Sequence, residues 1–308
     1  MATPRKATQA MLADIKIAHS IFALPFALLA AVMAARPAPL SGIEAVSDQT
    51  LVVGLLLILA AMVTARTAAM LSNRILDQSI DARNPRTAKR PLAAGVVSPK
   101  QYNVGWLVMS ALFIAVAGCF WIFNANPWPI MLSVPVLAWI CVYGLFKRFT
   151  AWCHIWLGAS LALSVPAAAV AVNPAVLVGP ELWLLSGMVL CWVAGFDVIY
   201  ALQDVDVDRD EGLHSIPSRL GAIRALWISR SLHAVSVGLL VLIWWLDPRF
   251  GRVFFAGITL VAALLVVEHA TVRQWGTTRM ALTFVMLNGI VSCVLGVAGI
   301  LDVCWSAT

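Results

Sequence analysis

Nine apolar segments, each close to the length that crosses a lipid bilayer, constrain this chain more than any other feature. They cover approximately residues 18–35, 50–73, 102–123, 128–146, 153–172, 181–203, 224–246, 252–270 and 280–301. A helix needs about 20 apolar residues to span the hydrocarbon core. Only 12% of the residues are charged, against about a quarter in soluble domains. We therefore expect an all-α, polytopic membrane protein with nine transmembrane helices, organised as one domain over residues 1–308.

The distribution of Lys and Arg among the loops predicts how the chain is oriented. Loops on one side carry sixteen of these residues, and loops on the other side carry only Arg36, Arg249 and Arg252. Basic residues concentrate in the cytoplasmic loops of membrane proteins. We expect a cytoplasmic N-terminus and an external C-terminus. The net charge of +6 follows this membrane rule, so it does not indicate nucleic-acid binding.

Acidic residues are scarce, and eight of the fifteen lie at the ends of two apolar segments. A helix aligns residues about four apart on one face. The first set is Asn73, Asp77 and Asp81. These residues share one face if the second predicted helix extends as far as Asp81. The second set is Asp197, Tyr200, Asp204 and Asp208. Two such faces turned toward each other would enclose a central polar cavity at the cytoplasmic boundary.

Oxygen ligands arranged in this way are typical of sites for hard divalent cations. Mg²⁺ usually needs one or two carboxylates together with substrate phosphates. Ionisable residues at membrane depth are costly and usually functional, which argues against solvated helix-end charges. The two clusters therefore predict Mg²⁺ ions that hold a diphosphate. The histidines have no zinc-ligand spacing.

Basic residues near the clusters could bind the phosphates. Arg83, Arg86, Lys89 and Arg90 are also explained by positive-inside placement alone. Tyr143 and Lys147 lie one helical turn apart on one face. Arg66 lies inside an apolar segment and needs an anionic partner. That partner is either Asp77 in a structural ion pair or the carboxylate of an aromatic acid substrate, and we favour the second.

These residues resemble the UbiA superfamily of intramembrane aromatic prenyltransferases, over nearly the whole chain. The family's first signature, an Asn with Asp at the fourth and eighth positions after it, is matched by Asn73, Asp77 and Asp81. Residues 89–95 resemble the loop that follows. Residues 197–204, continuing to Asp208, resemble the second signature, and Tyr143 to Lys147 match its Tyr-x-x-x-Lys element. One departure is Arg74, where many relatives carry Asp.

The resemblance implies a role for each matching residue. Mg²⁺ would be held by Asn73, Asp77, Asp81, Asp204 and Asp208. The diphosphate of a polyprenyl donor would be bound, and its departing charge stabilised, by Tyr143, Lys147, Arg148, Lys89 and Arg90. Asp197 would act as a base or cation stabiliser with Tyr200 on its catalytic face, and Arg66 would anchor the acceptor's carboxylate.

The branch of the family is indicated by residues 66–70, 84–87 and 212–217. These stretches resemble bacterial enzymes named as 4-hydroxybenzoate polyprenyltransferases, some of which prenylate 1,4-dihydroxy-6-naphthoate on the futalosine route to menaquinone. The resemblance implies an enzyme of the bacterial inner membrane with its active site facing the cytoplasm. Its partners would be a polyprenyl diphosphate, an aromatic acid and the lipid bilayer. The choice between the two acceptors stays open, as do ubiquinone and menaquinone as end products.

Two other classes of membrane protein place carboxylates within the bilayer. A CDP-alcohol phosphotransferase would carry a motif that begins with Asp-Gly, with an Ala-Arg pair before the later aspartates, and this pattern is absent. An ion-coupled transporter would place its carboxylates near the bilayer midplane on broken helices. Here they lie at helix ends on the positively charged side, which favours an enzyme.

Overall fold

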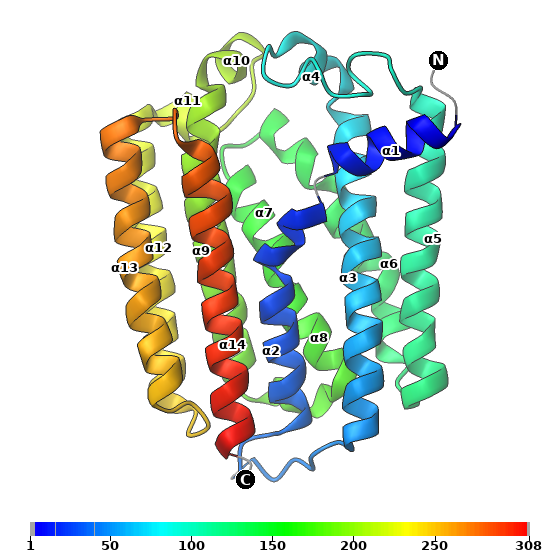
Figure 1. Ribbon diagram of the computed structural model, residues 1–308, viewed down its shortest axis with the longest axis vertical. Helices are drawn as coiled ribbons and strands as arrows, with labels where there is room; N and C mark the ends of the chain where they lie inside the picture. The colour runs from blue at the N-terminus through cyan, green and yellow to red at the C-terminus, as the bar shows by residue number, and fades with distance from the viewer. Residues whose placement is uncertain (1–3, 16, 40, 307–308) are drawn as a thin grey trace.

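The computed structural model describes residues 4–15, 17–39 and 41–306, and within them the chain is helical with no strands. Eight stretches are long and apolar enough to cross a membrane: Asp48–Leu76, Pro99–Asn124, Trp128–Arg148, Cys153–Val172, Glu181–Asp210, Ala222–Leu246, Arg252–Trp275 and Phe284–Ser306. The first predicted span, 18–35, corresponds to a shorter apolar helix, Ser20–Ala35, so eight of the nine predicted spans are long enough to cross. The protein is therefore an all-α, multi-pass membrane protein (Figure 1).

The helices follow one another with short connections. The α-helices are α1 (Pro4–Asp14), α2 (Leu24–Ala35), α3 (Asp48–Leu76), α4 (Gln78–Arg83), α5 (Pro99–Asn124), α6 (Trp128–Val142), α7 (Cys153–Ala162), α8 (Ser164–Val172), α9 (Glu181–Tyr200), α10 (Val205–Asp210), α11 (Ile216–Leu220), α12 (Ala222–Leu246), α13 (Arg252–Trp275) and α14 (Asn288–Ser306). Tighter or wider turns form η1 (Ile17–Phe22), η2 (Tyr143–Arg148), η3 (Pro174–Val178), η4 (Ala201–Asp204) and η5 (Ala281–Leu287).

Helix α2 forms the centre of the packed bundle. Nine of its twelve residues are buried, and it packs against α3, α8 and α14. A helix that is apolar all round can be buried on every side. Phe26 of α2 meets the indole of Trp192 edge to face, with ring centroids 5.5 Å apart. This shorter helix is therefore surrounded by the longer ones (Figure 1).

Three of the predicted continuous helices are interrupted, two of them at the acidic sets. The second ends at Leu76, and α4 begins at Gln78 after a single intervening residue. Helical hydrogen bonds nevertheless continue from Asp77 N to Asn73 O (3.0 Å) and from Asp81 N to Asp77 O (2.8 Å). The fifth is broken between α7 and α8, just before Pro166, whose ring and missing N–H disfavour a helix interior. The sixth passes from α9 through the 3₁₀ turn η4 into α10.

These breaks place the polar segments together at one end of the bundle. Helices α4, α10 and α11 cover the end where the N-terminus lies, and the C-terminus lies at the opposite end (Figure 1). Helix α1 crosses α3 and α5 at the first of these ends. It is held by Asp14, which pairs with Arg74 (3.1 Å) and accepts a hydrogen bond from the Tyr102 hydroxyl (2.9 Å). Lys16 lies outside the described residues.

Candidate active site

The carboxylate of Asp77 is buried at the end of α3 and is bound by two cations. The Lys147 ammonium lies 2.6 Å from Oδ2, and the Arg148 guanidinium lies 3.4 Å from Oδ1. Arg148 also donates to the Leu76 carbonyl. Both cations come from η2, which continues α6, so the Tyr-x-x-x-Lys element meets the first acidic set directly.

A close backbone approach accompanies this contact. Gly144 of η2 lies so near Asn73 that an added Cβ would stand 2.3 Å from the Asn73 Oδ1. A Cβ at this position would force the Asn73 side chain to move, so glycine lets η2 pack against Asn73 without displacing it. The neighbouring Tyr143 lines the large cavity described below, with its hydroxyl 4.0 Å from the Met70 sulfur.

Asp81 is paired within its own loop. Both of its carboxylate oxygens accept hydrogen bonds from the Arg90 guanidinium at 2.7 Å. The Thr87 hydroxyl donates to the Asp81 carbonyl (3.0 Å). This hydrogen bond holds the turn that brings Arg90 back to the Asp81 side chain. Lys89 is exposed. The loop after α4 thus brings Arg90, but not Lys89, to the acidic set.

The second acidic set is joined to the first by Arg86. Its guanidinium forms a bidentate pair with Asp204, at 2.9 Å and 2.6 Å, and donates to the Tyr200 hydroxyl at 3.0 Å. The Asn84 amide also donates to Asp204 (3.1 Å). Bidentate guanidinium pairs are among the stronger and more directional charged contacts. Arg86 and Asn84 therefore connect the loop that follows Asp81 to Asp204 of the second acidic set.

A further pair links the same loops at their exposed edge. Arg83 donates to both carboxylate oxygens of Glu211. This hydrogen bond lowers the pKa of the Glu211 carboxyl from its ordinary value. The pair reinforces the bridge between α4 and the end of α10.

Asp208 and Asp197 are met by a serine and a histidine, whereas the other site aspartates are met by Lys or Arg. The Ser215 hydroxyl lies 2.6 Å from Asp208 Oδ2, and His154 Nδ1 lies 2.7 Å from Asp197 Oδ2. Because α9 ends at Tyr200 and η4 intervenes, these two aspartates do not lie on one continuous α-helix, contrary to the sequence prediction. Asp197 lies within α9, and Asp208 lies on α10.

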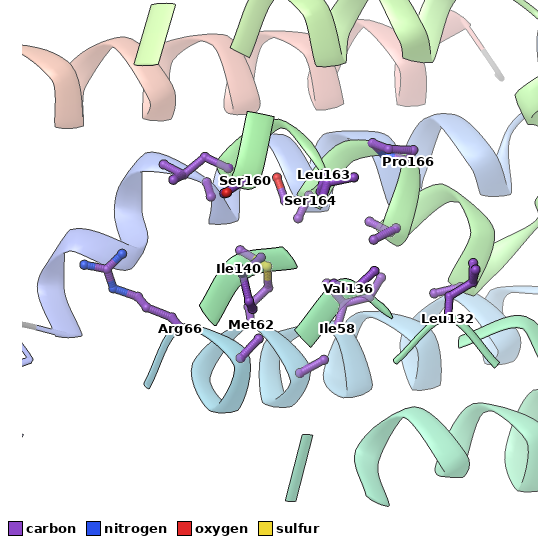
Figure 2. Close-up of a pocket in the computed structure, with 18 of the residues that line it drawn as sticks. Ile58, Met62, Arg66, Leu132, Val136, Ile140, Ser160, Leu163, Ser164 and Pro166 are labelled. Carbon is purple, nitrogen blue, oxygen red and sulfur yellow. The ribbon is translucent and has the colours of Figure 1, made fainter. Parts of the chain in front are cut away.

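An apolar cavity of about 460 Å³ opens beside these groups, among α3, α6, α7 and α8. Figure 2 shows Arg66 extending from α3 at one end of the lining residues, with Leu132 at the other. The Nε of Arg66 is buried without a hydrogen-bond partner among the described residues. Asp77, the alternative partner in the sequence prediction, is bound by Lys147 and Arg148 instead. The guanidinium is therefore available to an anion in the cavity.

The oxygen donors fit the Mg²⁺ site predicted from the sequence only if phosphate oxygens supply further ligands. Among the described residues, no group of three His, Cys, Asp or Glu side chains lies close enough to hold a metal alone. Mg²⁺ binds through few carboxylates when phosphate oxygens complete its octahedron. The site thus fits a metal that arrives with a diphosphate, for which Asp77, Asp81 and Asp204 would exchange their Lys and Arg partners and Asp208 its Ser215 partner.

The structure adds four residues that the sequence prediction did not select: Asn84, Arg86, His154 and Ser215. Arg86 was weighed there only as one of several cytoplasmic basic residues, while the other three had no sequence signal as partners. Asn84, Arg86 and His154 contact aspartates far away in the sequence, and Ser215 contacts Asp208 across the turn that joins α10 to α11.

Comparisons with known proteins place the chain in one family. Residues 23–290 match the model of the UbiA prenyltransferase family. The 4-hydroxybenzoate octaprenyltransferase of Yersinia pseudotuberculosis is 30% identical over 209 residues, which cover 68% of this chain and 69% of the relative. The enzyme of the same name from Chromohalobacter salexigens is 29% identical over 222 residues, 71% of each chain.

Solved structures show the same fold. The apo structure of a UbiA homolog from Aeropyrum pernix aligns with a TM-score of 0.79 and 32% identity, covering 93% of this chain and 98% of that one. A UbiA homolog from Archaeoglobus fulgidus, bound to GPP and Mg²⁺, aligns with a TM-score of 0.65 and 18% identity, covering 96% and 99%. The chain belongs to the UbiA prenyltransferase family.

Proposed function

We propose that the protein transfers a polyprenyl group from a polyprenyl diphosphate to an aromatic hydroxy acid, 4-hydroxybenzoate or 1,4-dihydroxy-6-naphthoate, in ubiquinone or menaquinone biosynthesis. The observation that carries the proposal is the apolar cavity with the unpartnered Arg66 Nε at one end, beside the paired acidic clusters. The relatives named 4-hydroxybenzoate octaprenyltransferase support the reaction. The family match favours it over a CDP-alcohol phosphotransferase or an ion-coupled transporter.

The donor would lie with its diphosphate at the clusters and its chain in the cavity. Lys147, Arg148, Arg86 and Arg90 supply four positive charges around that position. Asn73, Asp77, Asp81, Asp204 and Asp208 would hold Mg²⁺, which would supply positive charge to the diphosphate; the Archaeoglobus homolog is bound to GPP and Mg²⁺. The apolar walls bury the prenyl chain and exclude water that would trap a cation.

The reaction breaks the donor C1–O bond and one ring C–H bond, forms one C–C bond, and passes the ring proton to a base. The bond from the prenyl C1 to the diphosphate oxygen breaks, and its electrons leave with the diphosphate, whose charge Lys147 and Arg148 stabilise with Tyr143 nearby. The acceptor ring, anchored by its carboxylate on Arg66, attacks the allylic cation ortho to its hydroxyl. The ring carbon then loses its proton to Asp197, and Tyr200 lies beside this acid on α9.

The charge distribution supports an orientation in the membrane. We propose a single prenyltransferase domain over residues 1–308 in a bacterial inner membrane. The clusters would face the cytoplasm, because their end of the bundle carries most of the Lys and Arg residues. A charged acceptor from the cytoplasm would then reach the cavity at the end where Arg66 lies.

The direct test is product formation with both acceptors. Purified protein is supplied with Mg²⁺, one polyprenyl diphosphate and each acid in turn, and the product mass is measured. We expect Asp204→Asn to abolish transfer while the exposed Asp206, changed to Asn, serves as the matched control. Absence of product from both acids with the unmodified protein would refute the proposal.

The acceptor site is tested separately with Arg66→Met. We expect a rise in the acceptor KM of roughly tenfold or more, because a charged hydrogen bond contributes about 1.5–3 kcal/mol, while the donor KM changes little. Arg230→Met is the matched control, since Arg230 stacks on Trp227 of α12 outside the cavity. Equal effects of Arg66→Met on both substrates would remove Arg66 from the acceptor site.

A further inference from the structure

His154 is buried at the first turn of α7 and contacts the second acidic set. Its side chain is 3% exposed. Nδ1 lies 2.7 Å from Asp197 Oδ2, and on the other side of the ring the Ile216 backbone N–H donates to Nε2 at 3.2 Å. The ring thus joins α7, α9 and the start of α11.

The second contact fixes where the ring proton lies. A backbone N–H can only donate, so Nε2 must carry a lone pair. The single proton of a neutral imidazole is then on Nδ1, and it is donated to the carboxylate of Asp197. His154 is therefore a donor toward Asp197, and its other nitrogen is blocked.

The segment that receives the ring also holds Asp208. Ser215 donates to Asp208 Oδ2, and it begins α11 in a capping box with Ser218. The preceding residue, His214, donates its backbone N–H to the Lys147 carbonyl at 2.6 Å. Loop 213–216 is thus tied to η2, α7 and α10 at once, so the anchor at Nε2 is a rigid one.

We propose that His154 is a positioning residue that fixes Asp197 as the base for the acceptor's ring proton. Oδ2 of Asp197 is occupied by His154, whereas none of the hydrogen bonds of the described residues reaches Oδ1, and the side chain is 20% exposed. The ring proton goes to Oδ1, and the C–H electrons restore the aromatic ring. Because Nε2 accepts from Ile216, this proton leaves from the exposed side of Asp197 and does not pass to His154. The inference rests on the proposed function.

Two substitutions separate the two hydrogen bonds of the ring. An Asn amide replaces the Nδ1 position and can still donate to Asp197, while a Gln amide replaces the Nε2 position and can still accept from Ile216. We expect His154→Gln to lower kcat roughly tenfold or more, the usual effect of losing a group that orients a reacting one. His154→Asn should retain most of kcat, and neither change should alter the donor KM.

A kinetic isotope effect distinguishes misplacement of the base from general damage. The acceptor is deuterated at the ring carbon that is prenylated. A misplaced base slows proton removal, so the isotope effect on kcat should rise in His154→Gln and stay near the unmodified value in His154→Asn. His269→Gln is the control, because His269 contacts His233 on α12 and none of the site residues.

The outcomes separate the inference from the function. No product from the unmodified protein would refute the proposed function itself. An active unmodified protein in which the Gln variant equals or exceeds the Asn variant, with unchanged isotope effects, would overturn the role of His154. If His154→Gln does not fold, His154→Asn is compared with Asp197→Asn, and an equal loss of kcat in both would also overturn it.

Discussion

The ion pair between Lys147 and Asp77 should hold η2 against the end of α3, and its removal gives a measurable loss of stability. The two charged atoms lie 2.6 Å apart, and the side chains are 28% and 3% exposed, respectively. We consider Lys147→Met, which keeps the length of the chain but removes the charge. The buried Asp77 carboxylate then loses its shorter contact.

The size of the effect follows from the burial of the two partners. Removing one partner of a fully buried pair costs about 3–5 kcal/mol. Here Lys147 is partly hydrated already, and Arg148 remains 3.4 Å from Asp77 Oδ1. We therefore expect a loss of about 2 kcal/mol in the free energy of unfolding. Lys147→Arg keeps the charge and should cost less.

A double-mutant cycle in mixed detergent micelles, with unfolding followed by circular dichroism, measures the pair itself. Asp77→Asn removes the charge that Lys147→Met leaves uncompensated. The double variant should therefore be more stable than the sum of the single losses predicts, by roughly 1 kcal/mol or more, as for residues in contact. Additive losses, or a Lys147→Met variant as stable as the unmodified protein, would refute the reasoning.

Three other outcomes can be checked. Gly144→Ala should lower the free energy of unfolding by about 1–3 kcal/mol, because the new Cβ would displace the Asn73 amide; unchanged thermal stability would contradict the close packing. Mg²⁺ and a polyprenyl diphosphate together should raise the Tm by more than the sum of their separate shifts, because the site needs phosphate oxygens to complete the coordination shell of the metal. EDTA should remove the excess shift, and additive shifts would count against the metal site. Arg83 lowers the pKa of Glu211, so their contact holds at neutral pH and is lost as the pH falls through the lowered pKa; hydrogen exchange in residues 83–96 should accelerate over that range, and Glu211→Gln should remove this pH dependence.

Much of the fold follows from hydrophobic length alone. The predicted segment 50–73 became α3 at Asp48–Leu76, and 224–246 became α12 at Ala222–Leu246. Long apolar runs have few alternatives in a bilayer, because every backbone group must be satisfied within its own helix. The helix breaks were harder to predict, since only the one near Pro166 has a sequence signal. The turn at Asp77 has none, and it depends on the contact with η2.

The candidate site was also predictable only in part: the spacing of the acidic residues, but not their partners. The spacing of Asn73, Asp77 and Asp81 could be read from the sequence because helical hydrogen bonds continue through the turn. The partners could not be read, since Arg86 meets Asp204 across 118 residues and His154 meets Asp197 across 43. Such pairs depend on how separate helices pack, which residue spacing does not encode.

The pairing of the acidic residues also explains why this site needs so many cations. A carboxylate removed from water without a partner costs several kcal/mol, and Asp77 and Asp81 are both buried. Each is met by a Lys or Arg from a different segment, so the charges that a diphosphate would require also stabilise the fold before any substrate binds. On the proposed function, a metal that enters with the diphosphate would bring positive charge to the carboxylates, and the diphosphate would bring negative charge to the cations. This exchange of partners would keep both sets neutralised at the edge of the membrane.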